Sequence, residues 1–142
     1  MPIITTRSNL EGAIFRNILR IVEEYQVSNS SISVQDTEKN ITFPNYTLFL
    51  PLYGRNKTSN QGSRSTVSAT MVIDFDATMS QGYKKCNEMH QALEDGLESE
   101  EDNLQTARLR YTGSEIVDFL PIDINGQQVL CKTVRFDLEV LL

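Results

Sequence analysis

The segment from Thr66 to Phe75 constrains the fold most strongly, because its side chains alternate between two chemical classes. Successive side chains of a β-strand point to opposite faces of the sheet, so the alternation predicts a strand with one face in the core. The other face is mostly polar and suits contact with water or a partner. The apolar positions are Val67, Ala69, Met71, Ile73 and Phe75, and those between them are Thr66, Ser68, Thr70, Val72 and Asp74.

Two other segments repeat apolar residues at three- and four-residue steps, which is the spacing of one helix face. Each segment is therefore predicted to be an amphipathic helix with one face to bury. The first set is Leu10, Ile14, Ile18, Ile21, Val22 and Tyr25, and the second is Tyr83, Cys86, Met89, His90, Leu93 and Leu97.

The remaining strand signals are short and joined by turns. Asn125-Gly126 is a strong hairpin signal between two of them. Hairpins and half-exposed alternation predict an α+β fold with a mainly antiparallel sheet and two helices packed on one face. A chain of 142 residues forms this most simply as a single domain, 1-142. The further predicted strands are 31–34, 45–50, 107–111, 115–123 and 129–142.

Composition narrows the function classes. The net charge is −6, and the acidic run 94–102 accounts for it, so the rest of the chain is neutral and gives no support for nucleic-acid binding. This run is interpreted as a solvated helix end and loop. The N-terminus lacks the pattern of a signal peptide and no apolar run suits a membrane span, so no membrane partner is expected. Cys86 and Cys131 are expected to be free thiols in a reducing compartment.

The stretch 71–80, MVIDFDATMS, resembles the nucleophile motif of haloacid-dehalogenase-type phosphatases. In that family, the first Asp attacks phosphorus and sits at the end of a central parallel strand that is apolar on both faces. Here one strand face is polar, and the later acidic pair that would hold magnesium is missing. Asp74 and Asp76 are instead expected to end a strand and begin a helix. The chain is therefore predicted not to be an enzyme, with no catalytic residues and no cofactor.

Cys86 and His90 lie four residues apart on one helix face, which is a possible half-site for a metal ion. Zinc requires three or four ligands, and Cys131 is the one remaining Cys or His. Cys86 and His90 both fall on the apolar face of the predicted helix, so they are interpreted as core residues and no metal site is predicted.

The segment 53-65 is rich in Gly, Ser and Asn and is predicted to be a mobile loop. It carries Arg55, Lys57 and Arg64 and no acid. Two readings stay open for it: a plain flexible hairpin tip, or a basic contact loop that becomes ordered against a partner.

The order and size of these elements resemble those of the tail terminator proteins of long-tailed bacteriophages. The corresponding parts cover nearly the whole chain. They are a first helix (Leu10–Tyr25), a Phe-Pro step (Phe43-Pro44) into a strand (Tyr46–Leu50), a long loop (Tyr53–Ser65), a long alternating strand (Thr66–Phe75), a second helix (Tyr83–Leu97) and a final strand (Val129–Leu142). The strands predicted at 107–111 and 115–123 depart from this pattern. They would also suit another neck component, such as a head-closure or tail-completion protein.

The resemblance implies a structural virion protein of the tail or neck. Such a protein forms a homo-oligomeric ring, usually a hexamer, that caps the tail tube, stops its polymerisation and offers a surface for joining the head connector. The implied partners are the protein itself, the tail tube protein and the head–tail connector or neck protein, with DNA as passing cargo. The implied location is the virion, after assembly in the cytoplasm of the bacterial host. Arg55, Lys57 and Arg64 would then contact acidic partner surfaces or the passing DNA.

Overall fold

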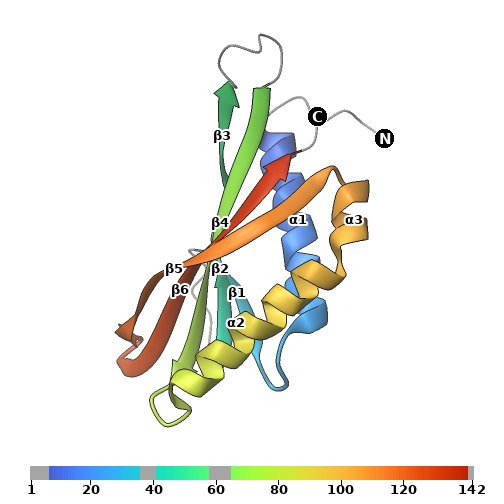
Figure 1. Ribbon diagram of the computed structural model, residues 1–142. Coiled ribbons are helices and arrows are strands. Elements are labelled where there is room, and N and C mark those ends of the chain that lie inside the picture. Colours follow the sequence, from blue (N-terminus) through green and yellow to red (C-terminus); the bar gives the residue numbers. More distant parts are fainter. Residues whose placement is uncertain (1–6, 36–40, 58–64, 141–142) are drawn as a thin grey trace.

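The computed structural model describes residues 7–35, 41–57 and 65–140, which form an α+β fold (Figure 1). Its elements follow the order helix, four strands, two helices and two strands. They are α1 (Arg7–Tyr25), β1 (Ser31–Val34), β2 (Asn45–Leu48), β3 (Leu52–Lys57), β4 (Ser65–Thr78), α2 (Gly82–Ser99), α3 (Glu101–Thr106), β5 (Leu109–Ile124) and β6 (Gln127–Val140).

All six strands belong to one mixed sheet with the order β1-β2-β4-β6-β5, and β3 pairs with β4 beyond the end of β2. The pairing of β1 with β2 is parallel, whereas every other pairing is antiparallel. The prediction of a mainly antiparallel sheet therefore holds with one parallel pair added. The parallel pair requires the chain to return from the end of β1 to the start of β2, and residues 36–40 of that return lie outside the described residues.

The inner face of the sheet forms the core together with both long helices. The alternating positions Met71, Ile73 and Phe75 of β4 are fully buried, as the sequence predicts. They share one hydrophobic cluster with Ile14 of α1 and Met89 of α2. The short helix α3, which the sequence analysis did not predict, adds one further buried side chain, Leu104.

The strand β4 is longer than predicted and corrects the interpretation of its two aspartates. Asp74 and Asp76 lie within β4, and α2 begins only at Gly82. Pairing with β2 and β6 continues through both aspartates, since Asp76 is opposite Asn45 on one side and Cys131 on the other. The two acids therefore do not serve the start of a helix.

Two other segments also differ from the predictions. The first part of the predicted loop 53-65 is strand β3, whose residues Leu52–Lys57 pair with Ser65–Thr70 of β4. The strands predicted at 107–111 and 115–123 are one continuous strand, β5, with irregularities between Tyr111 and Gly113 and between Ile116 and Asp118. Each irregularity is the signature of a β-bulge, which shifts the alternation by one residue.

The hairpin predicted at Asn125-Gly126 is confirmed. Asn125 and Gly126 have φ angles of 52° and 83°, and they connect β5 directly to β6. Two successive residues with positive φ are typical of a type I′ turn, whose twist matches that of the flanking strands.

The acidic run 94–102 is only partly a solvated surface, because it spans the end of α2 and the start of α3. Glu100 is buried between the two helices, and its carboxylate accepts a hydrogen bond of 2.9 Å from the guanidinium of Arg20 on α1. This hydrogen bond lowers the pKa of Glu100. The contact ties the first helix to the junction of α2 and α3.

Substitution by alanine is expected to have opposite effects on the free energy of unfolding at Gly96 and at Gly12. A Cβ atom at Gly96 would lie 2.6 Å from Cγ of Tyr25, so α1 and α2 contact each other at a point that leaves no room for a methyl group. Gly96→Ala is therefore expected to lower the free energy of unfolding by about 1–3 kcal/mol, despite the better helix propensity of alanine. Chemical denaturation measures this change.

The matched control lies in α1. A Cβ atom at Gly12 would meet only the flexible end of Arg16, at 3.1 Å. Gly12→Ala is expected to raise the free energy of unfolding by up to about 1 kcal/mol. Equal stabilisation by both substitutions would contradict the close helix contact at Gly96. In a Tyr25→Ala background, which lacks the ring, Gly96→Ala should lose most of its destabilising effect.

Candidate functional site

The aspartate pair of β4 lies on the sheet face opposite the core. Asp76 is 2% exposed, and an oxygen (Oδ1) of Asp76 and one of Asp74 have no hydrogen-bond partner within the described part of the chain. The second oxygen of Asp76 accepts a long hydrogen bond of 3.4 Å from the hydroxyl of Thr47. Burial, and then the nearby charge of Asp74, raise the pKa of Asp76 to about 6. Burial also raises the pKa of Asp74.

This geometry does not match the phosphatase that the motif resembles. A phosphatase of that class carries its two acids at the end of a central parallel strand, whereas β4 is antiparallel to all of its neighbours β2, β3 and β6. Asp74 and Asp76 lie beside neighbouring strands and not at an open strand end. Within the described residues, no group of three or more His, Cys, Asp or Glu side chains is placed to hold a metal ion.

Cys86 and His90 are buried, which confirms their interpretation as core residues. The thiol of Cys86 donates to the backbone carbonyl of Phe75 at 3.4 Å, and burial raises the pKa of the thiol to about 11. The ring of His90 stacks on that of Phe75, with the ring centroids 5.5 Å apart. Neither side chain is presented as a reactive group.

His90 also belongs to a polar contact that the sequence analysis did not predict. Its Nε2 atom lies 2.9 Å from the carboxylate of Glu94 and 3.3 Å from the hydroxyl of Ser114. The Ser114 hydroxyl donates to the same Glu94 oxygen, at 2.5 Å. In a catalytic triad, the acid and the nucleophile occupy different ring nitrogens. Here both contact the same nitrogen, so the arrangement fits helix–strand attachment and not nucleophile activation.

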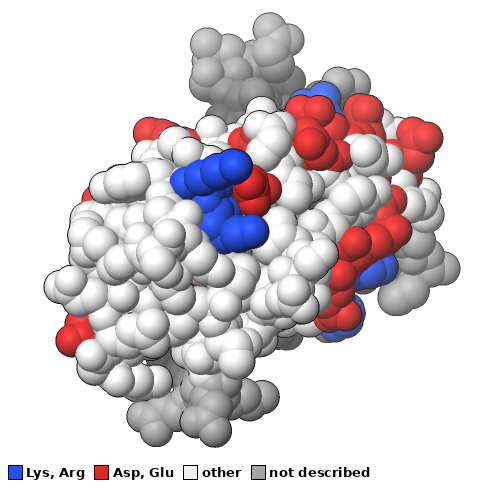
Figure 2. Space-filling model, turned by 90° about the horizontal axis from the view of Figure 1, so that it is seen from below, with Lys and Arg blue, Asp and Glu red and all other residues white. Residues whose placement is uncertain are grey.

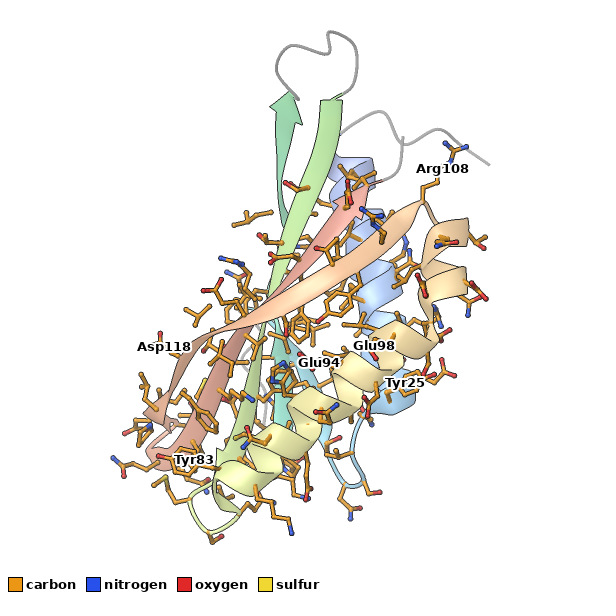
Figure 3. All side chains as sticks on the ribbon, in the orientation of Figure 1. Tyr25, Tyr83, Glu94, Glu98, Arg108 and Asp118 are labelled. Atoms are coloured by element: carbon orange, nitrogen blue, oxygen red, sulfur yellow. The ribbon has the colours of Figure 1, made fainter. Side chains whose placement is uncertain are left out.

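A cavity of about 410 Å³ lies beside this contact, between α2, α3 and the first part of β5. Glu94 and Glu98 project into it from α2, as Figure 3 shows, and Tyr111 lines it from β5. Arg110 also lines it, but its guanidinium is paired with the carboxylate of Glu139. The cavity therefore has an acidic wall.

The basic residues predicted to contact a partner are placed only in part. Arg55 and Lys57 lie in β3, where their backbones pair with Val67 and Ser65 of β4. Arg64 lies outside the described residues. The contact role of Arg55, Lys57 and Arg64 stays a prediction.

The sheet ends in two edges that are free of strand pairing among the described strands. One side is formed by β5, which pairs with β6, and the other side by β1, which pairs with β2, and by β3, which pairs with β4. Exposed strand edges carry unpaired backbone donors and acceptors and are ready to pair with another chain. The second half of β5 extends with β6 to the lower left of Figure 1, where the ring of Phe119 contacts that of Tyr83 at the start of α2.

Large apolar side chains are exposed near both edges. Ile116 and Val117 of β5 are each 52% exposed, and Leu120 is 43% exposed. Near the opposite edge, Leu50 and Leu52 are 60% and 71% exposed. Seen from below, charged side chains are sparse over much of the surface, and acidic ones gather towards one side (Figure 2). The sequence analysis missed these residues, since single exposed apolar residues carry no signal before the sheet edges are known.

Comparison with known proteins adds a likeness to solved structures. No protein-family model matches the sequence, and a comparison with curated proteins finds no match. Among solved structures, a similar chain belongs to one described as the virion of a native gene transfer agent (GTA) particle. The two chains are 12% identical, the match covers 92% of this chain and 94% of that chain, and the TM-score is 0.46. A likeness of this size defines neither fold nor function, so the functional inference depends on the residues of the chain itself.

Within the described residues, no helix is both long enough and apolar enough to cross a membrane.

Proposed function

We propose that this protein is a phage tail terminator, a structural virion protein that forms a ring and caps the tail tube. The observation that carries the proposal is a single sheet whose two sides end in different outer strands, β5 on one side and β1 with β3 on the other. Different surfaces on two sides of a subunit favour heterologous contacts, which close into a ring when the rotation between copies is right. The order of elements supports the same class, because a helix, a strand after Phe43-Pro44, a long strand, a helix and a final strand follow one another.

The mechanism is binding alone. The ring docks on the last ring of the tube protein, prevents addition of further tube subunits and presents its other face to the head connector or neck protein. DNA passes through as cargo. The protein assembles in the bacterial host cytoplasm, remains in the virion at the junction of tail and neck, and has no enzymatic activity.

The decisive measurement combines mass in solution with tube assembly. A stable ring, expected as a hexamer, should shorten or block the tubes that the tube protein forms, as seen by negative-stain imaging. A ring that joins connectors without limiting tube length would instead assign the protein to the head-closure or tail-completion class. A strict monomer that leaves tubes unchanged would refute both. Magnesium-dependent turnover of a phosphoester that Asp74→Asn abolishes would refute the non-enzymatic proposal.

The basic contact residues give a separate prediction. Reversing the charge of Arg55, Lys57 and Arg64 to Glu should weaken tube capping without unfolding the protein, because charge complementarity governs partner encounter. Capping at rising salt concentration measures the effect, and circular dichroism checks the fold. The matched control reverses Arg16, Lys84 and Lys85, which changes the net charge equally at helix positions. Unchanged capping by the first variant would remove these residues from the interface.

A further inference from the structure

Two outer strands on opposite sides of the sheet, β5 and β3, are complementary in charge, whereas the third outer strand, β1, has no charged residue. The strand β5 carries three acids and one base, since Glu115, Asp118 and Asp123 accompany Arg110. The strand β3 carries two bases, Arg55 and Lys57, and no acid. Glu115 and Arg110 are engaged within the subunit by Arg135 and Glu139. Asp118 is exposed, and Figure 3 places it on the second half of β5.

The two edges also match in length and in apolar content. The first half of β5 lies beside α2 and α3, so the accessible part of this edge begins near Glu115. Pro121 lacks an amide hydrogen and limits strand addition beyond it. The segment Glu115–Leu120 between these limits is as long as β3, which has 6 residues. Ile116, Val117 and Leu120 are exposed there, and Leu52 is exposed at the start of β3.

From these features we infer that Glu115–Leu120 of one copy pairs as a strand with β3 of the next copy. The inferred occupant of each edge is therefore a second copy of this chain, and the sheet continues from subunit to subunit. The pairing satisfies backbone groups on both edges, buries apolar side chains from both, and places Asp118 near the basic strand. The inference specifies the contact through which the proposed ring forms, so it depends on the ring proposal.

The contact joins two different edges, so it propagates in one direction around the ring. A continuous sheet closes into a ring when its strands tilt relative to the ring axis, which offsets neighbouring edges along the strand direction. Such an offset suits this chain, because the accessible part of β5 and the strand β3 lie towards opposite ends of the sheet in Figure 1.

Two variants that each break one edge test the inference. Ile116→Asp with Leu120→Asp disrupts the β5 edge and leaves β3 intact, whereas Leu50→Asp with Leu52→Asp disrupts the β3 edge and leaves β5 intact. Each variant alone should be monomeric by analytical ultracentrifugation. An equal mixture should form a dimer containing one copy of each, since only one productive pair of edges remains. Met79→Asp, at an exposed apolar position in the turn before α2, is the control and should assemble like the unmodified protein.

Cross-linking tests the register of the same contact. The strands alternate in direction across the sheet, so β5 of one copy and β3 of the next pair antiparallel, which places Leu120 opposite Leu52. Leu52→Cys and Leu120→Cys are prepared separately and mixed under oxidising conditions, where a disulfide should join the two different variants. The native thiols Cys86 and Cys131 are buried and should not compete. Circular dichroism verifies that every variant is folded.

Several outcomes would overturn the inference. Normal assembly of both edge variants would show that the edges are not the contact, and self-association of the β3-edge variant alone would indicate pairing between two β5 edges. Failure of the two cysteine variants to cross-link would refute the stated pairing. Edge-dependent rings that leave tubes unchanged would support the inference but refute the tail terminator proposal. Tube capping that persists in both edge variants would refute the inference and support the tail terminator proposal.

Discussion

Replacing Phe75 with alanine should lower the free energy of unfolding by about 3–5 kcal/mol, because it removes the ring at the centre of the core. Phe75 is fully buried. Its ring centroid lies 5.6 Å from that of Tyr46 and 6.2 Å from that of Phe136, in edge-to-face arrangements. The substitution therefore removes contacts with β2 and β6 simultaneously and leaves a cavity that these packed rings cannot fill.

Urea denaturation of the purified protein measures the change. Met79→Ala removes an apolar side chain that is 46% exposed, and it should alter stability by less than about 0.5 kcal/mol. Phe75→Leu keeps most of the buried volume and should cost less than Phe75→Ala. Similar stability of Phe75→Ala and Met79→Ala would contradict the position of Phe75 in the core.

The second large effect depends on pH. The pKa of Asp76 is about 6 in the folded protein, above its ordinary value of 3.8. Below about pH 4, the carboxyl is protonated in both the folded and unfolded states and has no cost. Between about pH 4 and pH 6 the carboxyl ionises in the unfolded chain but stays protonated in the folded protein, so stability falls, and above this range both states are ionised and the loss is constant. The loss is about 3 kcal/mol by about pH 8, given roughly 1.4 kcal/mol for each pKa unit.

Asp76→Asn removes this ionisation and should therefore stabilise the protein by up to about 3 kcal/mol near pH 8, with little effect near pH 4. Denaturation across this pH range measures the difference between the two proteins. Glu23→Gln, at an exposed position of α1, is the matched control and should leave the pH profile unchanged. A constant difference at every pH would mean that ionisation of Asp76 is not its cause.

Much of the fold could be predicted from the sequence where one period dominates. Apolar residues at every second position predicted β4, apolar residues at three- and four-residue steps predicted α1 and α2, and Asn125-Gly126 predicted the turn between β5 and β6. The predictions failed where pairing with other strands decides the structure. The segment 52–57 lacks alternation and becomes a strand by pairing with β4, and the bulges near Gly113 and Val117 interrupt the period that would have joined β5 into one element.

The candidate site was less predictable than the fold. The charges of Arg55 and Lys57 are visible in the sequence, but their position at a free edge depends on the strand order. The buried state of Asp76 was missed, since acids after an apolar run ordinarily indicate a strand end. Lys132 shows the same difficulty, because it is buried on the core side of β6 and donates a hydrogen bond of 2.8 Å to Asn87.

The long strands β4 and β6 have a mechanical consequence. They run antiparallel and pair continuously from Val67 opposite Val140 to Thr78 opposite Val129. The hydrogen bonds of such a ladder lie perpendicular to the strands. A pull along the strands would load these bonds together, so that they share the force, whereas a pull across one end would break them one after another. The subunit should therefore resist tension along its strands far better than peeling, and single-molecule pulling in the two directions would measure the difference.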